Sequence, residues 1–275
     1  MQSAMLPCTM CRGQKRAAEG NDGGIKYWWI LPFLSFFFSL NNQSFWIDEC
    51  CTALCAMQQG MEGCWKKICE IGGSDAQMAF YYYLLFLWHH LTGAESEWML
   101  RLFNIFWVFL SSWFFRKEPK ALVILLISPF FVYYSNELRP YMLQIAASCA
   151  VSMLFWQVSR GEPVKFHVFF GSLFFLCLTS LTGVVWALGF AAAFMVMAFR
   201  QFGGRRFRRA LLWWIFPFSG LGAYYLYTLF LGARAVSISS SWIVNACASM
   251  YELSGLAGMG PSRLELRMCM TPDAL

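Results

Sequence analysis

Long stretches of this chain consist mostly of apolar side chains, and short polar connections separate them. The run from Trp28 to Leu40, for example, carries no charge. A helix that crosses a membrane needs roughly twenty consecutive apolar residues, and most of these stretches approach that length. We therefore expect helices at these apolar segments: Tyr27–Leu40, Ala79–Leu91, Trp98–Phe115, Ala121–Tyr134, Tyr141–Val158, Val164–Leu181, Val184–Phe199 and Ala210–Leu231.

The composition assigns the chain to the membrane proteins. Of the 275 residues, 59% are hydrophobic and only 13% are charged, whereas about a quarter of the residues in an average soluble domain are charged. The predicted fold class is all-α, a polytopic transmembrane helix bundle, rather than a soluble domain with one core.

The basic residues cluster in the polar connections and predict the topology. The formal net charge is +6, and the loops Arg116–Lys120, Arg160–Lys165 and Arg200–Arg209 hold much of it. We interpret these clusters as cytoplasmic loops and not as a nucleic-acid surface. If the segment Ala79–Leu91 does not cross the membrane, all three basic loops lie on the same side of the membrane as the basic amino terminus. The pattern thus predicts about seven spans, with Ala79–Leu91 an interfacial helix on the outer surface.

This topology divides the chain into three parts. Residues 1–26 are expected to form a disordered cytoplasmic tail, followed by an uncleaved first span. Residues 27–231 form the membrane module, whose outer loop, 41–97, bears interfacial helices. In that loop the aromatic side chains of Tyr81, Tyr82, Tyr83 and Trp88 suit the headgroup zone. Residues 232–275 are an outer tail, so the predicted localisation is the cell membrane, multi-pass, with the amino terminus inside.

The cysteines leave two alternatives open. Cys8 and Cys11 form a CxxC, but no second Cys or His pair follows nearby to complete a zinc site. Five more cysteines crowd the first outer loop. They form disulfides if that loop faces an oxidising compartment, or they are small buried thiols. The spacing does not select a pairing among Cys50, Cys51, Cys55, Cys64 and Cys69.

Unusual polar residues collect on the predicted outer face. Carboxylates are costly near hydrocarbon, so a group of them at span ends suggests a function. A carboxylate can remove a proton from a hydroxyl group, and arginine binds phosphate through two hydrogen bonds. The candidate catalytic residues are Asp48 and Glu49. The candidate donor-phosphate and substrate-binding residues are Asp75, Gln77, Arg101, Glu137, Arg139 and Tyr141.

Each candidate also has a purely structural alternative. Glu137 and Arg139 could pair with each other at the interface. Asp48 could cap the helix that follows it, and Asp75 could be an ordinary loop residue. Arg101 could anchor a helix to lipid headgroups. Dinucleotide-binding, Walker and H-E-x-x-H motifs do not occur, so soluble nucleotide chemistry and zinc hydrolysis have no support in the sequence.

Four short motifs occur in a specific order. They are Ser44–Glu49 (SFWIDE), Asp75–Tyr82 (DAQMAFYY), Trp98–Arg101 (WMLR) and Tyr134–Tyr141 (YSNELRPY). In this order they resemble the integral-membrane glycosyltransferases of the C-type fold. The most similar group is the bacterial relatives of dolichyl-phosphate-mannose protein mannosyltransferase, called family 39. The resemblance covers about 27–199.

The resemblance implies a chemistry and a role for several residues. It implies a polyprenyl-phosphate-sugar donor, an acceptor hydroxyl of a protein, lipid or glycan at the outer face, and inversion at the anomeric carbon. The family's catalytic aspartate falls on Asp48, with Glu49 beside it, and its second-loop acidic and basic pair falls on Glu137 and Arg139. No cofactor is implied, and Mg²⁺ held by the two adjacent carboxylates is kept as an alternative.

The chain differs from many of these relatives in three respects. The outer turn Ser180–Gly183 has no histidine, Ala79 stands where proline is usual, and relatives usually continue further at the carboxyl end. Two alternatives to an active enzyme follow. One is a non-catalytic or half-enzyme membrane subunit. The other is a lipid flippase or transporter, for which mid-span charges and inverted repeats would be expected.

Overall fold

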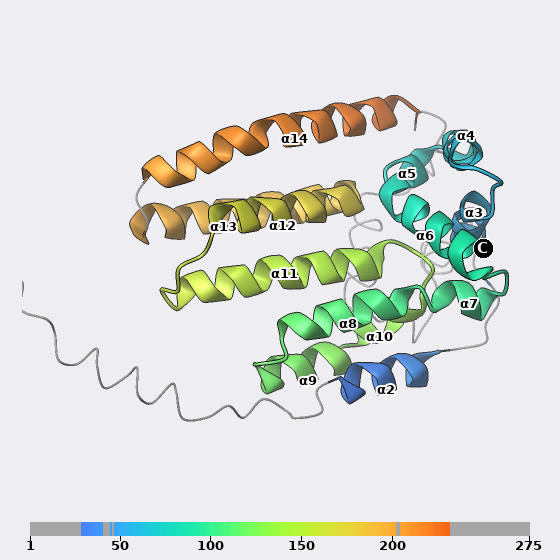
Figure 1. Ribbon diagram of the computed structural model, residues 1–275, viewed down its shortest axis with the longest axis horizontal. Coiled ribbons are helices and arrows are strands. Elements are labelled where there is room, and N and C mark those ends of the chain that lie inside the picture. The colour runs from blue at the N-terminus through green and yellow to red at the C-terminus, as the bar shows by residue number, and fades with distance from the viewer. Residues whose placement is uncertain (1–28, 41–44, 46, 202–203, 232–275) are drawn as a thin grey trace, which may run out of the picture.

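The computed structural model describes residues 29–40, 45, 47–201 and 204–231. The predicted tails at 1–26 and 232–275, and the Cys8–Cys11 pair, lie outside the described residues. Within the described residues all regular structure is α-helical, which confirms the predicted all-α class. The helices form two groups, a bundle and a cap at one end of it (Figure 1).

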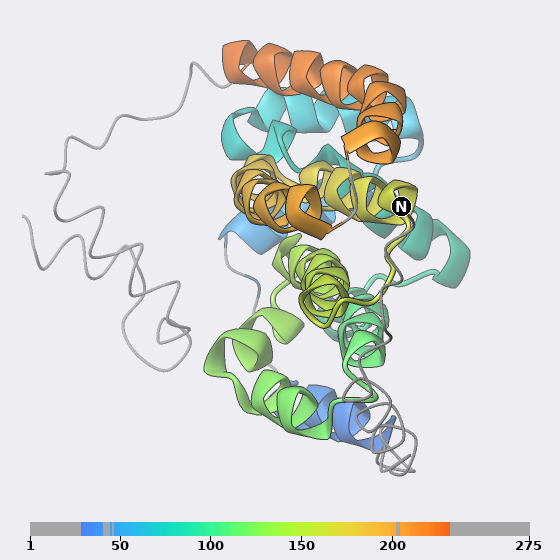
Figure 2. The same cartoon turned by 90° about the vertical axis from the view of Figure 1, so that its left-hand side faces the viewer.

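The bundle helices run side by side along the long axis of the molecule (Figures 1 and 2). They are α2 (Ile30–Ser39), α8 (Asn104–Phe114), α9 (Pro119–Ile127), α10 (Pro129–Asn136), α11 (Tyr141–Ser159), α12 (Phe166–Thr179), α13 (Leu181–Gln201) and α14 (Gly204–Leu231). The helix α11 is central, because it packs against α8, α12 and α13. In turn α12 packs against α14, which closes one side of the bundle.

The cap contains α3 (Ile47–Ala56), α4 (Met61–Ile71), α5 (Gly73–Ala76), α6 (Ala79–Thr92) and α7 (Glu97–Arg101). It corresponds to the predicted outer loop. The cap has a hydrophobic core of its own, in which Tyr81, Tyr82 and Leu85 are fully buried. The expectation that Tyr81 and Tyr82 face lipid headgroups is therefore wrong, because the Tyr81 ring packs against Phe103 and the Tyr82 hydroxyl accepts from Thr52 of α3. For the half-buried Tyr83 and Trp88 it stays a prediction.

Two predicted helices are interrupted in the structure. The segment Trp98–Phe115 is split into α7 and α8, because the chain tightens at Leu102 and Phe103. There the Phe103 amide donates to the carbonyl of Leu100, at 3.1 Å. The segment Ala121–Tyr134 is split into α9 and α10 at Ser128, since Pro129 has no amide hydrogen to continue the helix.

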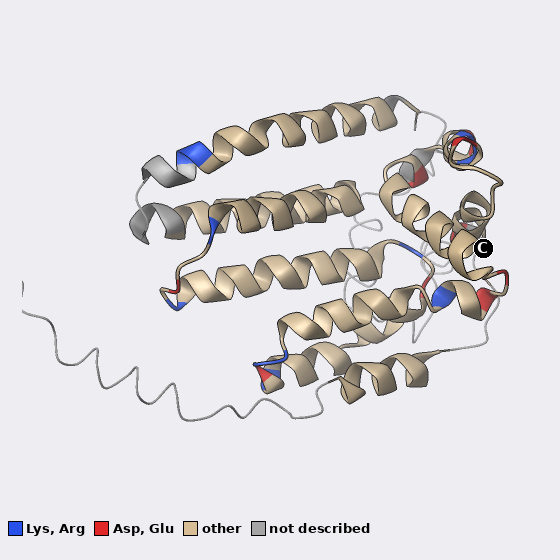
Figure 3. Ribbon diagram, in the orientation of Figure 1, with Lys and Arg blue, Asp and Glu red and all other residues tan. Residues whose placement is uncertain are grey.

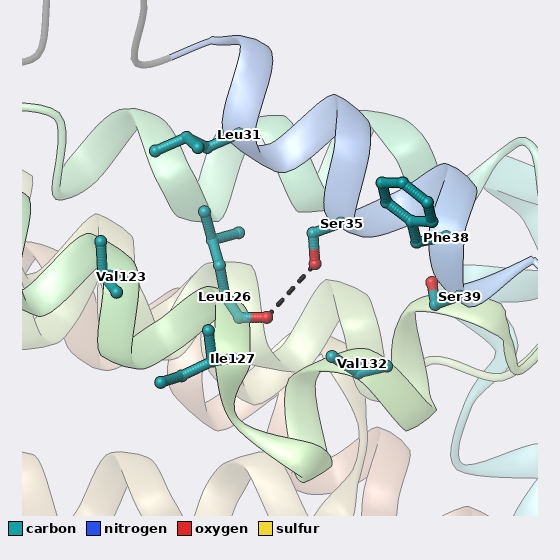
Figure 4. A pocket seen from close by; sticks show the side chains of 8 residues that line it. All are labelled: Leu31, Ser35, Phe38, Ser39, Val123, Leu126, Ile127 and Val132. Atoms are coloured by element: carbon teal, nitrogen blue, oxygen red, sulfur yellow. Dashed lines mark hydrogen bonds between the residues drawn. The ribbon is translucent and has the colours of Figure 1, made fainter.

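The break at Pro129 leaves a groove beside α2 (Figure 4). Its volume is about 380 Å³, and its lining is mostly apolar. The break also leaves carbonyl groups at the end of α9 without partners in the helix. One of them, on Leu126, accepts a hydrogen bond from the Ser35 hydroxyl at 3.2 Å. A side chain of α2 thus compensates for the interrupted helix.

The number of membrane spans stays a prediction. By length and composition, one helix among the described residues, α11, could cross a membrane. The helices α2 and α12 and residues Leu181–Met197 of α13 are also apolar but shorter. The break at Pro129 divides another apolar segment into two short helices, which accounts for part of the difference from the expected number.

Charged and large apolar side chains are distributed unevenly over the bundle. The bodies of the bundle helices carry few charges, and most charged residues lie at the ends (Figure 3). The α8–α9 connection, the α11–α12 connection and the start of α14 all lie at the end opposite the cap (Figure 1). Large apolar side chains line the outside of the bundle: Phe38 is 86% exposed and Phe216 is 87% exposed. Such surfaces are rare on soluble monomers.

The close approach of α12 to α13 depends on a glycine. The two helices meet at Ser180, and a side chain at Gly183 would lie 2.3 Å from the carbonyl oxygen of Leu176. Further along the contact, the rings of Phe169 and Phe194 stack with their centroids 3.6 Å apart. The turn at 180–183 therefore fixes how the second half of the bundle packs.

Gly183→Ala should lower the free energy of unfolding by about 1–3 kcal/mol, because the new methyl group forces backbone atoms apart. Gly189→Ala in the same helix is the matched control. A methyl group there meets nothing within 4 Å, and alanine is up to about 1 kcal/mol more favourable than glycine within a helix. Thermal unfolding in detergent compares the two; equal effects would contradict the packing at 183.

Candidate functional site

The two adjacent carboxylates at the start of α3 point in different directions. Asp48 and Glu49 both lie in the first turn of the helix. Successive residues of a helix are about 100° apart around its axis, so neighbours face different surroundings. The Asp48 side chain is 69% exposed, whereas the Glu49 side chain is only 1% exposed. The structure thus separates two residues that the sequence places together.

Glu49 forms a buried ion pair with Arg101, at the end of α7. Arg101 Nη2 lies 3.0 Å from Glu49 Oε2, and Arg101 Nε donates to Glu49 Oε1 at 3.3 Å. The backbone amide of Leu138 also donates to Glu49 Oε1, at 2.7 Å. The ring of Phe45 lies over the guanidinium, 4.9 Å from its carbon. Glu49 therefore links α3 to α7 and to the turn that follows α10.

Arg139 is the centre of a second group, next to the first. Its Nη1 lies 2.8 Å from Asp75 Oδ1 and donates to the Tyr82 hydroxyl at 3.2 Å. The Tyr82 hydroxyl donates in turn to Asp75 Oδ1. On the other side of the guanidinium, Nη2 lies 3.9 Å from Asp48 Oδ2. Residues from α3, α5, α6 and the α10–α11 turn thus meet around one buried arginine.

Burial and charge set the protonation of this group. Burial raises the pKa of Tyr82 well above its ordinary value, so the phenol keeps its proton and can donate to Asp75. Burial lowers the pKa of Arg139, but Tyr82, Tyr141, Asp75 and Asp48 together raise it above its ordinary value. Arg139 is therefore a permanent positive charge beside the exposed Asp48 carboxylate.

The Nε–Nη2 edge of Arg139 is the part of this group most relevant to a ligand. Among the described residues, Arg139 Nε is buried and has no hydrogen-bond partner, and the Nη2 contact with Asp48 is longer than a hydrogen bond. In Arg101 the same edge binds both oxygens of Glu49. An arginine edge of this kind fits a carboxylate or a phosphate.

The turn that carries Arg139 is held by a side chain that the sequence analysis did not single out. Asn104, at the start of α8, donates from Nδ2 to the carbonyl oxygens of Ser135, at 3.2 Å, and Glu137, at 2.7 Å. Its Oδ1 accepts from the Tyr81 hydroxyl at 3.1 Å. A buried asparagine at the head of an apolar run was the available signal, since such a side chain needs partners.

The remaining predicted residues lie around these two groups. Glu137 follows directly after α10, and the Arg139 amide donates to its carbonyl oxygen at 2.8 Å. Tyr141 opens α11, and its ring centroid lies 4.6 Å from that of Tyr134. Gln77 is half-buried in the turn between α5 and α6. The roles assigned to these residues stay predictions.

A further polar cluster lies at the α12–α13 turn, where many relatives of the resembled family carry a histidine. The hydroxyls of Ser180 and Thr182 both donate to Gln144 Oε1 of α11, at 3.0 and 3.1 Å. Their own oxygens lie 2.7 Å apart. This cluster connects the start of α11, close to Arg139 in sequence, with the tight contact at Gly183.

Metal ligands do not gather at this site in the part of the chain that the structure describes, where no group of three or more His, Cys, Asp and Glu side chains is arranged to hold an ion. The alternative of Mg²⁺ on Asp48 and Glu49 meets a specific difficulty, because both oxygens of Glu49 already accept hydrogen bonds. Comparison with protein-family models, with curated proteins and with solved structures finds no match to this chain.

Glu49→Gln should lower the free energy of unfolding by about 3–5 kcal/mol, because it leaves the Arg101 charge buried without its partner. Asp48→Asn, one residue away but exposed, should change it by less than about 0.5 kcal/mol. Thermal unfolding of both variants in detergent provides the comparison. Similar stabilities would show that the two carboxylates are equivalent and would contradict the buried ion pair.

Proposed function

We propose that the chain is a membrane glycosyltransferase that moves a sugar from a polyprenyl-phosphate donor to an acceptor hydroxyl, with inversion. The observation that carries this proposal is the exposed Asp48 carboxylate, 3.9 Å from a buried arginine with a largely unoccupied hydrogen-bonding edge. A base for the acceptor and a cation for the leaving phosphate are the two groups that the reaction requires. The order of motifs in the sequence supports the same assignment.

The arrangement of the molecule supports a site at a membrane surface. The basic connections lie at one end of the bundle and the cap lies at the other (Figures 1 and 3). If basic loops face the cytoplasm, the cap and Asp48 face the outer side. We propose about seven crossings, in which α9 and α10 together make one and α6 makes none.

In the proposed reaction, Asp48 takes the proton of the acceptor hydroxyl as its oxygen bonds to the anomeric carbon. The bond between that carbon and the phosphate oxygen breaks, and the polyprenyl phosphate leaves with one more negative charge than it had in the donor. Asp48 loses its charge in the same step. The total negative charge beside Arg139 therefore stays constant, so one buried cation can serve both the ground state and the transition state.

In this proposal the remaining charged residues hold the reacting groups in place and do not take part in the reaction themselves. Asp75 and Tyr82 orient the Arg139 guanidinium through its Nη1 group and leave the Nε–Nη2 edge for the phosphate. Glu49 and Arg101 bind each other and hold α3 beside the α10–α11 turn. We therefore propose that Glu49, expected from the sequence to be catalytic, is a positioning residue, and that Arg101 does not bind the phosphate.

Asp48→Asn should lower the rate of sugar transfer by roughly 10²–10⁴-fold, because the amide cannot accept the acceptor's proton. Transfer from a radiolabelled polyprenyl-phosphate sugar in membranes measures it, with protein levels matched. Glu62→Gln on α4 is the control: its side chain is 80% exposed and pairs with Lys66, so transfer should be unchanged. Full activity of Asp48→Asn would remove Asp48 as the base. An inactive parent protein would favour the non-catalytic subunit.

Arg139→Lys should weaken donor binding by roughly tenfold or more, because lysine keeps the charge but cannot offer two parallel donors to a phosphate. Arg160→Lys, at the opposite end of the bundle, should leave donor affinity unchanged. Binding of a polyprenyl phosphate to the purified protein gives the measurement. An unaltered affinity in Arg139→Lys would assign Arg139 to a structural pair with Asp75.

A further inference from the structure

The crowded cysteines of the cap differ in burial. Cys55 on α3 and Cys64 on α4 are both fully buried, whereas Cys50 is exposed and Cys51 and Cys69 are half-buried. All five lie within residues 50–69, in two helices joined by a short turn. The sequence leaves their pairing open, but the structure distinguishes them by the surfaces on which they lie.

Cys55 and Cys64 are buried in the same hydrophobic core, on the two helices that the α3–α4 turn connects. Cys55 is the penultimate residue of α3, and Cys64 lies in the first turn of α4, where its amide donates to the Gly60 carbonyl at 2.9 Å. The two helices pack directly against each other, and both side chains belong to the hydrophobic core of the cap. Both are free thiols in the structure, and two buried thiols on helices that pack against each other are the arrangement from which a disulfide between adjacent helices can form.

The protonation of these thiols agrees with their being neighbours. Burial raises the pKa of Cys55 to about 12, and the next largest influence is the thiol of Cys64, ahead of Cys51 one helical turn away. Burial also raises the pKa of Cys64, to about 11. Buried thiols of high pKa are poor nucleophiles and poor metal ligands, so catalysis and metal binding are unsuitable roles for this pair.

The other three cysteines face different surroundings. The charges that act on the Cys51 thiol include Asp75, Asp48 and Arg139, which places Cys51 on the side of the candidate site. Cys50 is exposed, and its thiol lies 3.7 Å from the carbonyl oxygen of Phe45. Cys69 is half-buried in the last turn of α4.

We propose that Cys55 and Cys64 form a disulfide that fastens α3 to α4 when the cap lies in an oxidising compartment. Each thiol loses one proton and one electron, and the sulfur atoms bond. The two electrons and two protons convert the disulfide of a thiol oxidoreductase into two thiols; this is the class of protein that oxidises secreted chains. Since α3 also carries Asp48 and Glu49, the bond restrains the helix on which the candidate site depends. The proposal requires that the cap lies in an oxidising compartment. It does not require that the protein transfers sugar.

Peptide mapping of the full chain tests the disulfide. The protein is produced in the membrane of cells with an oxidising outer compartment, and free thiols are blocked with N-ethylmaleimide before lysis. Cleavage after glutamate separates the pair, since Glu62 lies between them and yields peptides 50–62 and 63–70. We expect these peptides to be joined without reductant, with fragmentation locating the bond at Cys55 and Cys64. N-ethylmaleimide on both of these cysteines would overturn the proposal.

Two single variants distinguish a bond at Cys64 from a bond at Cys69, while fragmentation distinguishes Cys55 from Cys50 and Cys51. Cys64→Ala should abolish the joined peptides and lower the melting temperature, whereas Cys69→Ala should leave the joined peptides intact. If Cys64→Ala does not accumulate, the Cys69→Ala protein alone decides: loss of the joined peptides there would assign the bond to Cys69 and contradict the proposal. The joined peptides do not depend on activity, so an inactive protein that contains them would contradict the proposed function and leave the disulfide standing.

Discussion

The buried ion pair between Glu49 and Arg101 is the constraint on which the rest of the site depends. Neither charge can be buried alone without a penalty of several kcal/mol, so α3 and α7 must meet where the pair forms. Glu49 also accepts from the Leu138 amide, which brings the α10–α11 turn to the same point. Because Arg139 follows Leu138 and Asp48 precedes Glu49, one buried glutamate places both the base and the cation that we propose.

The part of the site that contains Asp75 is held in place by a different set of contacts, made by α5. The last described helix, α14, packs against α5, and the Tyr224 hydroxyl donates to the Ala76 carbonyl, next to Asp75. A helix as short as α5 has little stability of its own. Its position is therefore fixed by α14 and by the Asp75–Arg139 contact. Parts of the chain almost 150 residues apart in sequence cooperate to hold one carboxylate against one guanidinium.

Much of the helical structure could be predicted from the sequence, because apolar runs and helix boundaries are local properties. The helix predicted at Tyr141–Val158 is observed at Tyr141–Ser159. The interruption of the helix at Ser128 could also be predicted from the sequence, since Pro129 follows it. The break at Leu102 could not be predicted, because it carries no proline or glycine. The preceding residue, Arg101, pairs with Glu49, which lies 52 positions away in sequence.

The site was predictable as a set of residues but not as a division of roles. The order of the motifs indicated that Asp48, Asp75 and Arg139 belong together, and the structure brings them together. It also assigns opposite environments to Asp48 and Glu49, which only the packing of α3 decides. An asparagine within an apolar run signals that Asn104 needs partners, but the partners that the structure gives it, Tyr81, Ser135 and Glu137, cannot be read from a single sequence.

The orientation of the cap is the claim on which the proposed chemistry rests most directly, and the natural lysines of the chain can test it. Lys66 is exposed on the cap, and Lys117 and Lys120 are exposed at the opposite end of the bundle. Intact cells are treated with an amine-reactive reagent that cannot cross membranes, and the modified lysines are identified by mass spectrometry. We expect modification of Lys66 in intact cells, and of Lys117 and Lys120 only after permeabilisation. Modification of Lys117 and Lys120 in intact cells, with Lys66 protected, would contradict it.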